Sequence, residues 1–398
     1  MTDNKPARLA AIVLLLLAGV FAGTQLGKIA PLVGWYRSEV GFSLVLIGWL
    51  TSMIAIFVAL VALPAGWAIE RAGMRRAFVV ASCLLVAGGI AIALFERPTA
   101  ILAARMVEGA GYLILVIAIP AIACAIAQPS WRAPVLAAWG GFVAVGFAAA
   151  DFLAGWVLPS AGPQVYLLVA IAIFALLALG ASALLARIRD WPEERAPSPI
   201  GTSNSSIKAT LSAPVVFVAL AFGVYVILSV GFFTFMPAFV DDGSPLLISA
   251  GVVALTVPLG NLATSLLVRR CDGRLTAMLA AGGFAVTAAA AVPAFTADAA
   301  ILATAAAIIL AISGGVTASA LFASVPFIVP PAGSPSVAIG LIAQTGGLAT
   351  VIGPPLAGHV IDNYAWGGFG WFMAGWAAIG IASLVPLLAR KWEGGLAT

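Results

Sequence analysis

The sequence predicts an all-α integral membrane protein with twelve transmembrane helices, arranged in two pseudo-symmetric six-helix bundles. Three observations carry this prediction: the composition, the spacing of the apolar segments and the placement of the basic residues. Of the 398 residues, 63% are hydrophobic and 9% are charged, whereas a soluble domain carries roughly 25% charged residues. A water-exposed surface cannot be built from this composition, so the bilayer must be the solvent.

The apolar segments are each long enough to cross a bilayer, which needs about 20 mostly apolar helical residues. The first is too long for a signal-peptide core and has no obvious cleavage site. A polar stretch rich in proline and serine follows the sixth and has the composition of a linker. We therefore expect a first bundle at 1–187, a cytoplasmic linker at 188–211 and a second bundle at 212–398. The expected membrane segments are 8–32, 43–69, 76–95, 98–127, 132–159, 164–187, 212–239, 246–268, 275–296, 299–328, 337–361 and 367–389.

Lysine and arginine fall almost entirely on one side of the expected membrane. With both termini placed in the cytoplasm, 15 of the 19 basic residues lie in cytoplasmic segments, and the outer loops hold only Arg37 and Arg97. This asymmetry is the positive-inside rule, and a wrong number of helices would remove it. The sequence therefore predicts a multi-pass protein of the cytoplasmic (inner) membrane, with both termini cytoplasmic.

Four charged residues fall inside the expected membrane segments, and all four lie in the first half: Lys28, Arg105, Glu108 and Asp151. A charge at the bilayer centre costs at least about 2.5 kcal/mol, so such residues normally pair with one another or face a cavity. The direction of each segment places these four at similar depths, with Glu108 somewhat deeper, and their charges sum to zero. We therefore expect one interacting cluster.

Two interpretations of this cluster remain open. In the first, Arg105 pairs with Glu108 or Asp151 and fastens helices together, while Lys28 reaches toward the outer surface. In the second, Lys28 and Arg105 line a cavity and bind a substrate, while Glu108 or Asp151 takes up a coupling proton. Tyr112 falls on the same helical face as Arg105 and Glu108, so it belongs to the same candidate site.

The second half carries no charge inside its expected membrane segments. Asn261 and Gln344 can hydrogen-bond a substrate, but polar contacts between helices explain them equally well. Trp139, in the first half, is expected to help wall the cavity. The polar residues expected at depth in the second half are Tyr225, Asn261, Thr264, Ser313, Thr317 and Gln344.

The loop after the second segment reads "GWAIERAGMRR", residues 66–76. It resembles the signature that follows the second helix in the major facilitator superfamily: a glycine, an acid–arginine pair, a glycine and further basic residues. The acid of that family is usually aspartate, and Glu70 keeps the charge with one more methylene. The resemblance implies a cytoplasmic gate that breaks and reforms as the bundles rock. The matching residues are Gly66, Glu70, Arg71, Gly73, Arg75 and Arg76.

Further short motifs support the same resemblance. "RMVEGAG", residues 105–111, resembles the fourth-helix motif of the superfamily, an arginine followed by spaced glycines. "GKIAPL", "WGGFVAVGF" and "TGGLATVIGPPLAG" look like pieces of its cyanate- and nitroimidazole-permease branch. The fifth segment lacks the glycine–proline run of proton antiporters, which weighs against drug efflux.

The resemblance implies a secondary active transporter that works by alternating access. Because Lys28 and Arg105 are cations beside a neutral polar wall, we expect a small, anionic organic solute taken up with protons, as in a symporter. The alternative is proton-driven efflux of lipophilic or cationic compounds. No cofactor, metal or nucleic-acid partner is expected, and the chain is expected to be a monomer among membrane lipids. With one histidine, no P-loop and no nucleophile elbow, it is not expected to be an enzyme.

Overall fold

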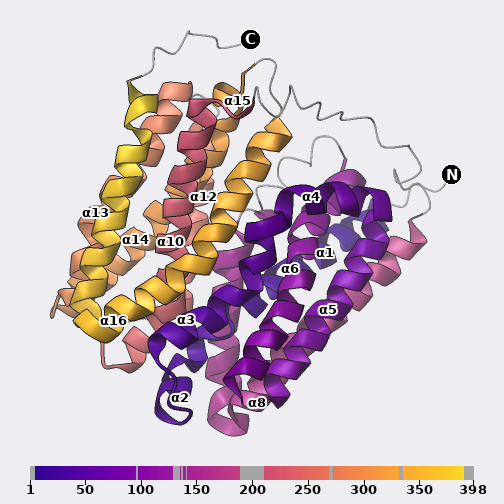
Figure 1. Cartoon of the computed structure of the whole chain (residues 1–398), viewed down its shortest axis with the longest axis horizontal. Coiled ribbons are helices and arrows are strands. Elements are labelled where there is room, and N and C mark those ends of the chain that lie inside the picture. Colours follow the sequence, from indigo (N-terminus) through magenta and orange to yellow (C-terminus); the bar gives the residue numbers. More distant parts are fainter. Residues whose placement is uncertain are drawn as a thin grey trace. The chain divides into compact units, whose positions relative to one another are not determined.

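The structure of the chain is a computed structural model that describes residues 5–95, 97–128, 135, 138–139, 141–188, 210–268, 272–330 and 335–389. Every regular element in these ranges is a helix (Figure 1). The predicted all-α class is therefore confirmed for this part of the chain. The predicted linker at 188–211 lies outside the described residues, apart from positions 188, 210 and 211.

Ten helices in the described ranges are long and apolar enough to cross a membrane. Two of them are much longer than one crossing: α8 (Phe142–Arg187) has 46 residues and α16 (Pro335–Leu388) has 54. A straight helix of 46 residues would be about 69 Å long, more than twice the thickness of a bilayer core. Each of the two contains one residue with non-helical backbone angles, Gly162 in α8 and Ala365 in α16. Figure 1 shows α16 turning back on itself.

The described residues group into two compact units, of which the first holds Met1–Leu32 and Met53–Ile200. In this unit α1 packs against α8 and α6, and α5 packs against α6 and α8. The helices of the first unit are α1 (Lys5–Gly27), α4 (Ile56–Ala72), α5 (Met74–Leu94), α6 (Pro98–Ile126) and α8.

Small residues bring the helices of the first unit into main-chain contact. A Cβ atom on Gly146 of α8 would lie 2.5 Å from the carbonyl carbon of Gly23 on α1. Thr24 Oγ1 donates a hydrogen bond to Gly146 O at 3.1 Å. A Cβ atom on Gly111 of α6 would similarly lie 2.5 Å from Ala81 O on α5. Such close approach is typical of membrane helices with small residues at their interfaces, and it fixes α1, α5, α6 and α8 around one interior.

The second unit holds Val33–Ser52 and Gly201–Thr398. Within it α10 packs along α16, α13 packs against α14 and α16, and α12 packs against α14. Its helices are α2 (Val33–Ser38), α3 (Leu44–Ser52), α10 (Ala213–Asp241), α11 (Ala250–Ala254), α12 (Val257–Val268), α13 (Gly273–Thr296), α14 (Ala300–Ala323), α15 (Val325–Ile328) and α16.

Residues 33–52, expected within the first bundle, group with the second unit because α3 packs against α16. A Cβ atom on Gly48 would lie 2.6 Å from the carbonyl carbon of Pro354, and one on Gly358 would lie 2.5 Å from Leu44 O. The segment is bounded on each side by a short 3₁₀ turn, η1 (Ala30–Leu32) and η2 (Met53–Ala55). Glycine at both contact points therefore lets α3 lie directly on the α16 backbone.

Candidate functional site

Three charged side chains meet inside the first unit. Lys28 follows the last residue of α1, and its main-chain N–H bonds to Thr24 O at 2.7 Å, so the helical turn continues through it. Arg105 and Glu108 lie three residues apart on α6, which places them on one face. All three side chains are 0% exposed. The structure thus brings together three of the four charges predicted to form a cluster.

One carboxylate binds both cations of this cluster. Lys28 Nζ lies 2.6 Å from Glu108 Oε1, and Arg105 Nη1 lies 2.8 Å from Glu108 Oε2. Each oxygen of Glu108 therefore accepts a charge-assisted hydrogen bond, which is about twice as strong as a neutral one. Removing one partner of a buried ion pair costs about 3–5 kcal/mol, because the other charge stays buried without compensation. Glu108 is accordingly the residue on which both buried cations depend.

Gln25, which the sequence analysis did not single out, completes the cluster. Its Oε1 accepts a hydrogen bond from Lys28 Nζ at 3.0 Å, and its main-chain oxygen accepts one from Arg105 Nη1 at 2.6 Å. Its Nε2 donates to Ala170 O on α8 at 3.3 Å, so Gln25 also ties α1 to α8. The sequence shows only that Gln25 lies about one helical turn before Lys28 in an apolar segment, which does not identify the groups that it binds.

The wall of the cluster on the α5 side is made of glycine. A Cβ atom on Gly88 would lie 2.5 Å from Glu108 Cγ, and one on Gly89 would lie 3.1 Å from Glu108 Oε1. The same position on Gly89 would lie 2.7 Å from Ile171 Cγ1 of α8. The space around Glu108 is therefore filled by backbone, and a larger residue on α5 would displace the carboxylate.

Asp151, the fourth predicted charge, is half-buried on α8. Across the break at Gly162, the Tyr166 hydroxyl donates a hydrogen bond to the main-chain oxygen of Ala150, the residue before Asp151, at 3.2 Å. Tyr112 on α6 is buried, as are Arg105 and Glu108 on the same predicted stripe. Tyr112 and Tyr166 are thus two further buried polar side chains on the helices of this unit, beside the half-buried Asp151.

Trp139 lies against α1 in the first unit. Its ring stacks on that of Phe142, with centroids 4.1 Å apart and planes inclined by 12°. A Cβ atom on Gly19 of α1 would overlap the Trp139 ring. The ring is half-buried, so one part of it packs on α1 while another part remains accessible. The predicted role of Trp139 in a cavity wall stays a prediction.

The predicted polar residues of the second unit have different surroundings. Asn261 Oδ1 on α12 accepts a hydrogen bond from Ser319 Oγ on α14 at 3.0 Å, which is a contact between helices. Gln344 is half-buried on α16. Ser313 Oγ lies 2.8 Å from Thr287 Oγ1, a second polar contact between helices. The Asn261 contact fits the alternative in which polar residues join helices, and the predicted role of Asn261 in substrate binding stays a prediction.

The predicted gating loop is described only in part. Gly73 separates α4 from α5 with a φ of 89°, a left-handed conformation that favours glycine. Arg75 Nη2 donates to Ile188 O at 2.7 Å, and Arg76 is exposed. The pairing predicted at this loop stays a prediction, because some of its side chains lie outside the described residues: Gly66, Glu70 and Arg71.

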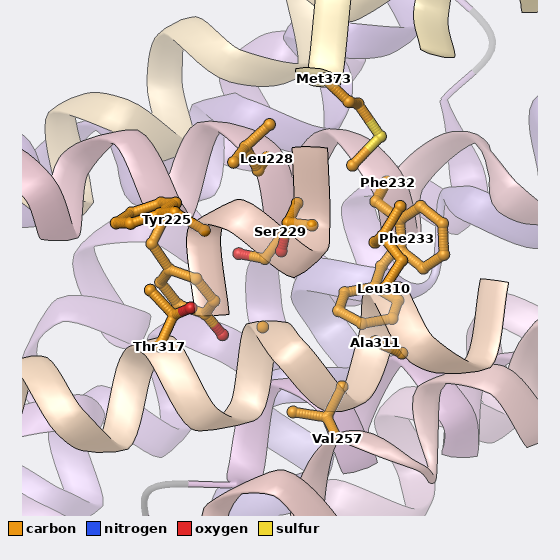
Figure 2. Close-up of a pocket in the computed structure, with 13 residues that line it drawn as sticks. Tyr225, Leu228, Ser229, Phe232, Phe233, Val257, Leu310, Ala311, Thr317 and Met373 are labelled. Carbon is orange, nitrogen blue, oxygen red and sulfur yellow. The ribbon is translucent and has the colours of Figure 1, made fainter. Parts of the chain in front are cut away.

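A small pocket lies inside the second unit, between α10, α12, α13, α14 and α16. Figure 2 shows Ser229 between Tyr225 and Thr317 on one side and Phe232 and Phe233 on the other. About 20 Å³ of it is open to the centre of a water molecule, which is room for one or two waters. The pocket is therefore too small to hold an organic solute in this structure.

Comparisons with known proteins agree with the fold. The family model of the Major Facilitator Superfamily matches residues 15–346. No curated protein matches the sequence. The structure is similar to that of a bacterial homologue of the human lysosomal transporter Spinster, crystallised inward-facing and unoccupied, with a TM-score of 0.73 and 16% identity over 97% of this chain and 96% of that chain. It is also similar to a mutant of the nucleoside transporter NupG, with a TM-score of 0.72 and 14% identity over 96% of this chain and 100% of that chain. At these identities the likeness concerns the fold alone.

Proposed function

This chain belongs to the Major Facilitator Superfamily, and we propose that it is a secondary active transporter that moves a small organic anion together with a proton. The family and the two similar structures support transport as the general activity. The substrate class and the coupling are supported by one observation, the sharing of a single buried carboxylate by two buried cations.

The shared carboxylate links anion binding to proton binding. A proton on Glu108 removes the negative charge that holds Lys28 and Arg105, and leaves two buried cations without it. An anion that then binds the two cations restores the lost charge. Binding both a proton and a monovalent anion leaves the net charge of the interior unchanged, whatever Asp151 contributes, whereas binding either alone changes it by one. Because buried charge is costly, the two ligands should bind together, as a symporter requires.

The chemistry of the two cations suits a carboxylate-like anion. Arginine offers a planar fork of N–H donors that matches a carboxylate, and lysine offers a compact ammonium. In this structure the Glu108 carboxylate occupies that place, bound through both of its oxygens. A substrate carboxylate would take the same donors after Glu108 is neutralised. Four further residues are proposed to contact the substrate beyond its charged group: Tyr112, Trp139, Asn261 and Gln344.

We propose twelve membrane crossings for this transporter. Because α8 and α16 are each too long for one crossing and are each interrupted near the middle, each would supply two crossings. The ten long helices then give twelve crossings. The asymmetry of basic residues supports cytoplasmic termini and a location in the cytoplasmic membrane. Gating at residues 66–76 and a monomeric state belong to the same proposal.

Binding of anions at different pH tests the proposal. Detergent-purified protein would be screened by thermal shift and calorimetry with small monocarboxylates, such as formate and benzoate, and with a lipophilic cation, tetraphenylphosphonium. Native protein should bind a monocarboxylate more tightly as the pH falls, by up to about tenfold per pH unit. Glu108→Gln, which imitates the protonated carboxyl, should bind it independently of pH. Lys28→Ala should lose the binding.

Arg37→Ala is the matched control, because Arg37 is an exposed cation whose nearest carboxylate, Asp242, lies 4.0 Å away at the surface. It should bind anions like the native protein. Stabilisation by tetraphenylphosphonium that persists in Lys28→Ala would contradict the proposal and favour efflux of lipophilic cations. If anion binding by Glu108→Gln still depended on pH, Glu108 would not be the residue that takes up the coupled proton.

A further inference from the structure

Both cations of the buried cluster have a second acceptor, and both acceptors belong to Gln25. The side-chain Oε1 accepts from Lys28 Nζ at 3.0 Å, and the main-chain oxygen accepts from Arg105 Nη1 at 2.6 Å. These two contacts do not involve Glu108. They can therefore persist when the Glu108 carboxylate is neutralised or displaced.

The surroundings fix the orientation of the Gln25 amide. Nε2 donates to two main-chain oxygens, Phe21 O and Ala170 O, each at 3.3 Å. A flipped amide would bring its NH₂ group against the Lys28 ammonium and its oxygen against the two carbonyl oxygens, with no donor for either pair. The side chain is fully buried, so water cannot replace these bonds. Gln25 is thus held with its oxygen toward Lys28.

We infer that Gln25 is a positioning residue that keeps Lys28 and Arg105 in place while Glu108 is protonated, so that a carboxylate-like anion meets a preformed pair of donors. This inference rests on the proposed function. The physical reason is preorganisation: donors that are already held cost less entropy to engage than donors released into a cavity. An apolar side chain at position 25 could not accept from Lys28, and an ionised one would face two carbonyl oxygens.

Among the residues that the structure describes, the charged and titratable groups named around this site lie on or next to three helices. The α5 side offers Gly88 and Gly89, which carry no charge. Lys28 follows directly after α1, whereas Arg105, Glu108 and Tyr112 lie on α6, and Asp151 and Tyr166 lie on α8.

Two substitutions test the inference in proteoliposomes that exchange a labelled monocarboxylate. Gln25→Met removes the side-chain acceptor but keeps the main-chain oxygen. Loss of a hydrogen bond to a charged group should raise the KM for the anion about 10- to 100-fold, while the maximal exchange rate per folded protein stays the same. A purely structural role would instead lower the folded fraction or the maximal rate.

Gln25→Glu tests the inference through the dependence of the KM for the anion on pH. Once protonated, the added carboxyl keeps an accepting oxygen for Lys28 and one O–H donor, where the amide has two N–H donors. At low pH the variant should therefore exchange the anion with the native KM. At higher pH the ionised group should bind Lys28 itself and exclude the anion, so the KM should rise with pH more steeply than in the native protein. Gln164→Glu, at an exposed position of α8, is the charge-matched control and should keep the native profile.

The outcomes separate the inference from the function on which it rests. Native exchange that depends on Lys28, combined with a native KM and pH profile in both Gln25 variants, would overturn the role of Gln25 and leave the transport proposal standing. Native protein without Lys28-dependent binding or exchange would overturn both. Recovery of Gln25→Glu at low pH shows in the same sample that the variant is folded.

Discussion

Gly88 lies where α5 meets Glu108, and its main chain is in direct contact with α6. A Cβ atom at this position would lie 2.5 Å from Glu108 Cγ, 2.6 Å from Glu108 N and 2.8 Å from Ala104 O. Two of these three atoms belong to the α6 backbone, so they cannot rotate away as the end of a side chain could. Any side chain at position 88 must therefore push two helices apart beside the ion pairs.

Gly88→Ala should lower the free energy of unfolding by about 1–3 kcal/mol, the usual cost of overpacking an interior. Gly155→Ala in α8 is the matched control, because a Cβ atom there has nothing within 4 Å, and it should cause no loss. Melting temperatures of the purified proteins in one detergent would measure both effects. Equal melting temperatures for the two variants would show that α5 and α6 can separate freely at this point.

At the scale of elements, α8 and α16 are each interrupted by one residue with non-helical backbone angles. This residue, here called the break, is a glycine in α8 and an alanine in α16. Gly162 has φ 77° and ψ 178°, and Ala365 has φ 54° and ψ −168°. Both lie in or near a region of backbone space that is essentially restricted to glycine and costs other residues about 1–3 kcal/mol. The α8 break is therefore relaxed, whereas the α16 break carries strain at an alanine.

Exchanging the two residue types should shift stability in opposite directions. Ala365→Gly should relieve the strain and so raise the free energy of unfolding and the melting temperature. The greater freedom of glycine in the unfolded chain offsets about 0.4–1 kcal/mol of this gain. Gly162→Ala should lower the free energy of unfolding by about 1–3 kcal/mol. Thermal unfolding in detergent checks both. A lower melting temperature for Ala365→Gly would mean that the alanine side chain contributes packing that outweighs its strain.

At the scale of the whole molecule, the two breaks decide how many times the chain crosses the membrane. If the chain turns back at each break on the outer side of the membrane, the residues next to both breaks face the outside. Ser160 beside the first break and Asn363 beside the second are exposed, so both positions would be open to reagents. Arg76, in the predicted cytoplasmic loop, is exposed as well.

Single cysteines at these three positions test the topology in intact cells, in a chain whose own cysteines, Cys83, Cys124 and Cys271, are replaced. A thiol reagent that cannot cross membranes should label Ser160→Cys and Asn363→Cys from outside. Arg76→Cys should be labelled only after the cells are permeabilised. Labelling of only one of the two turn positions in intact cells would rule out twelve crossings with both breaks outside.

The extent to which the sequence predicts this site depends on the kind of residue. Lys28, Arg105 and Glu108 could be predicted to meet because charges in a bilayer need partners. Gln25 could not, because its role depends on the carbonyl oxygen of Ala170, 145 residues away. A neutral amide in an apolar segment does not show from sequence which of its many potential partners it binds.

The same distinction holds for the fold. The sequence predicts an interruption between the membrane segments 132–159 and 164–187, and the α8 break at Gly162 falls there. The second break, at Ala365, lies between the expected membrane segments 337–361 and 367–389. The lengths of these apolar segments predict the interruption, because an alanine does not by itself indicate a break. The sequence predicts the helical character of α3, within the expected segment 43–69, but it expects an outer loop at 33–42, where the structure has the helix α2. The contact of α3 with α16 depends on glycines on two distant segments.

The packing of α3 on α16 also has a consequence for biosynthesis. The ribosome completes Gly48 roughly 300 residues before Pro354, the residue that Gly48 contacts on α16. At about 5–20 residues per second, α3 waits on the order of 15–60 seconds in the nascent protein before its partner exists. During that interval its glycine face must be covered by lipid or by the insertion machinery. One of the first segments to be translated is thus among the last to reach its native neighbour.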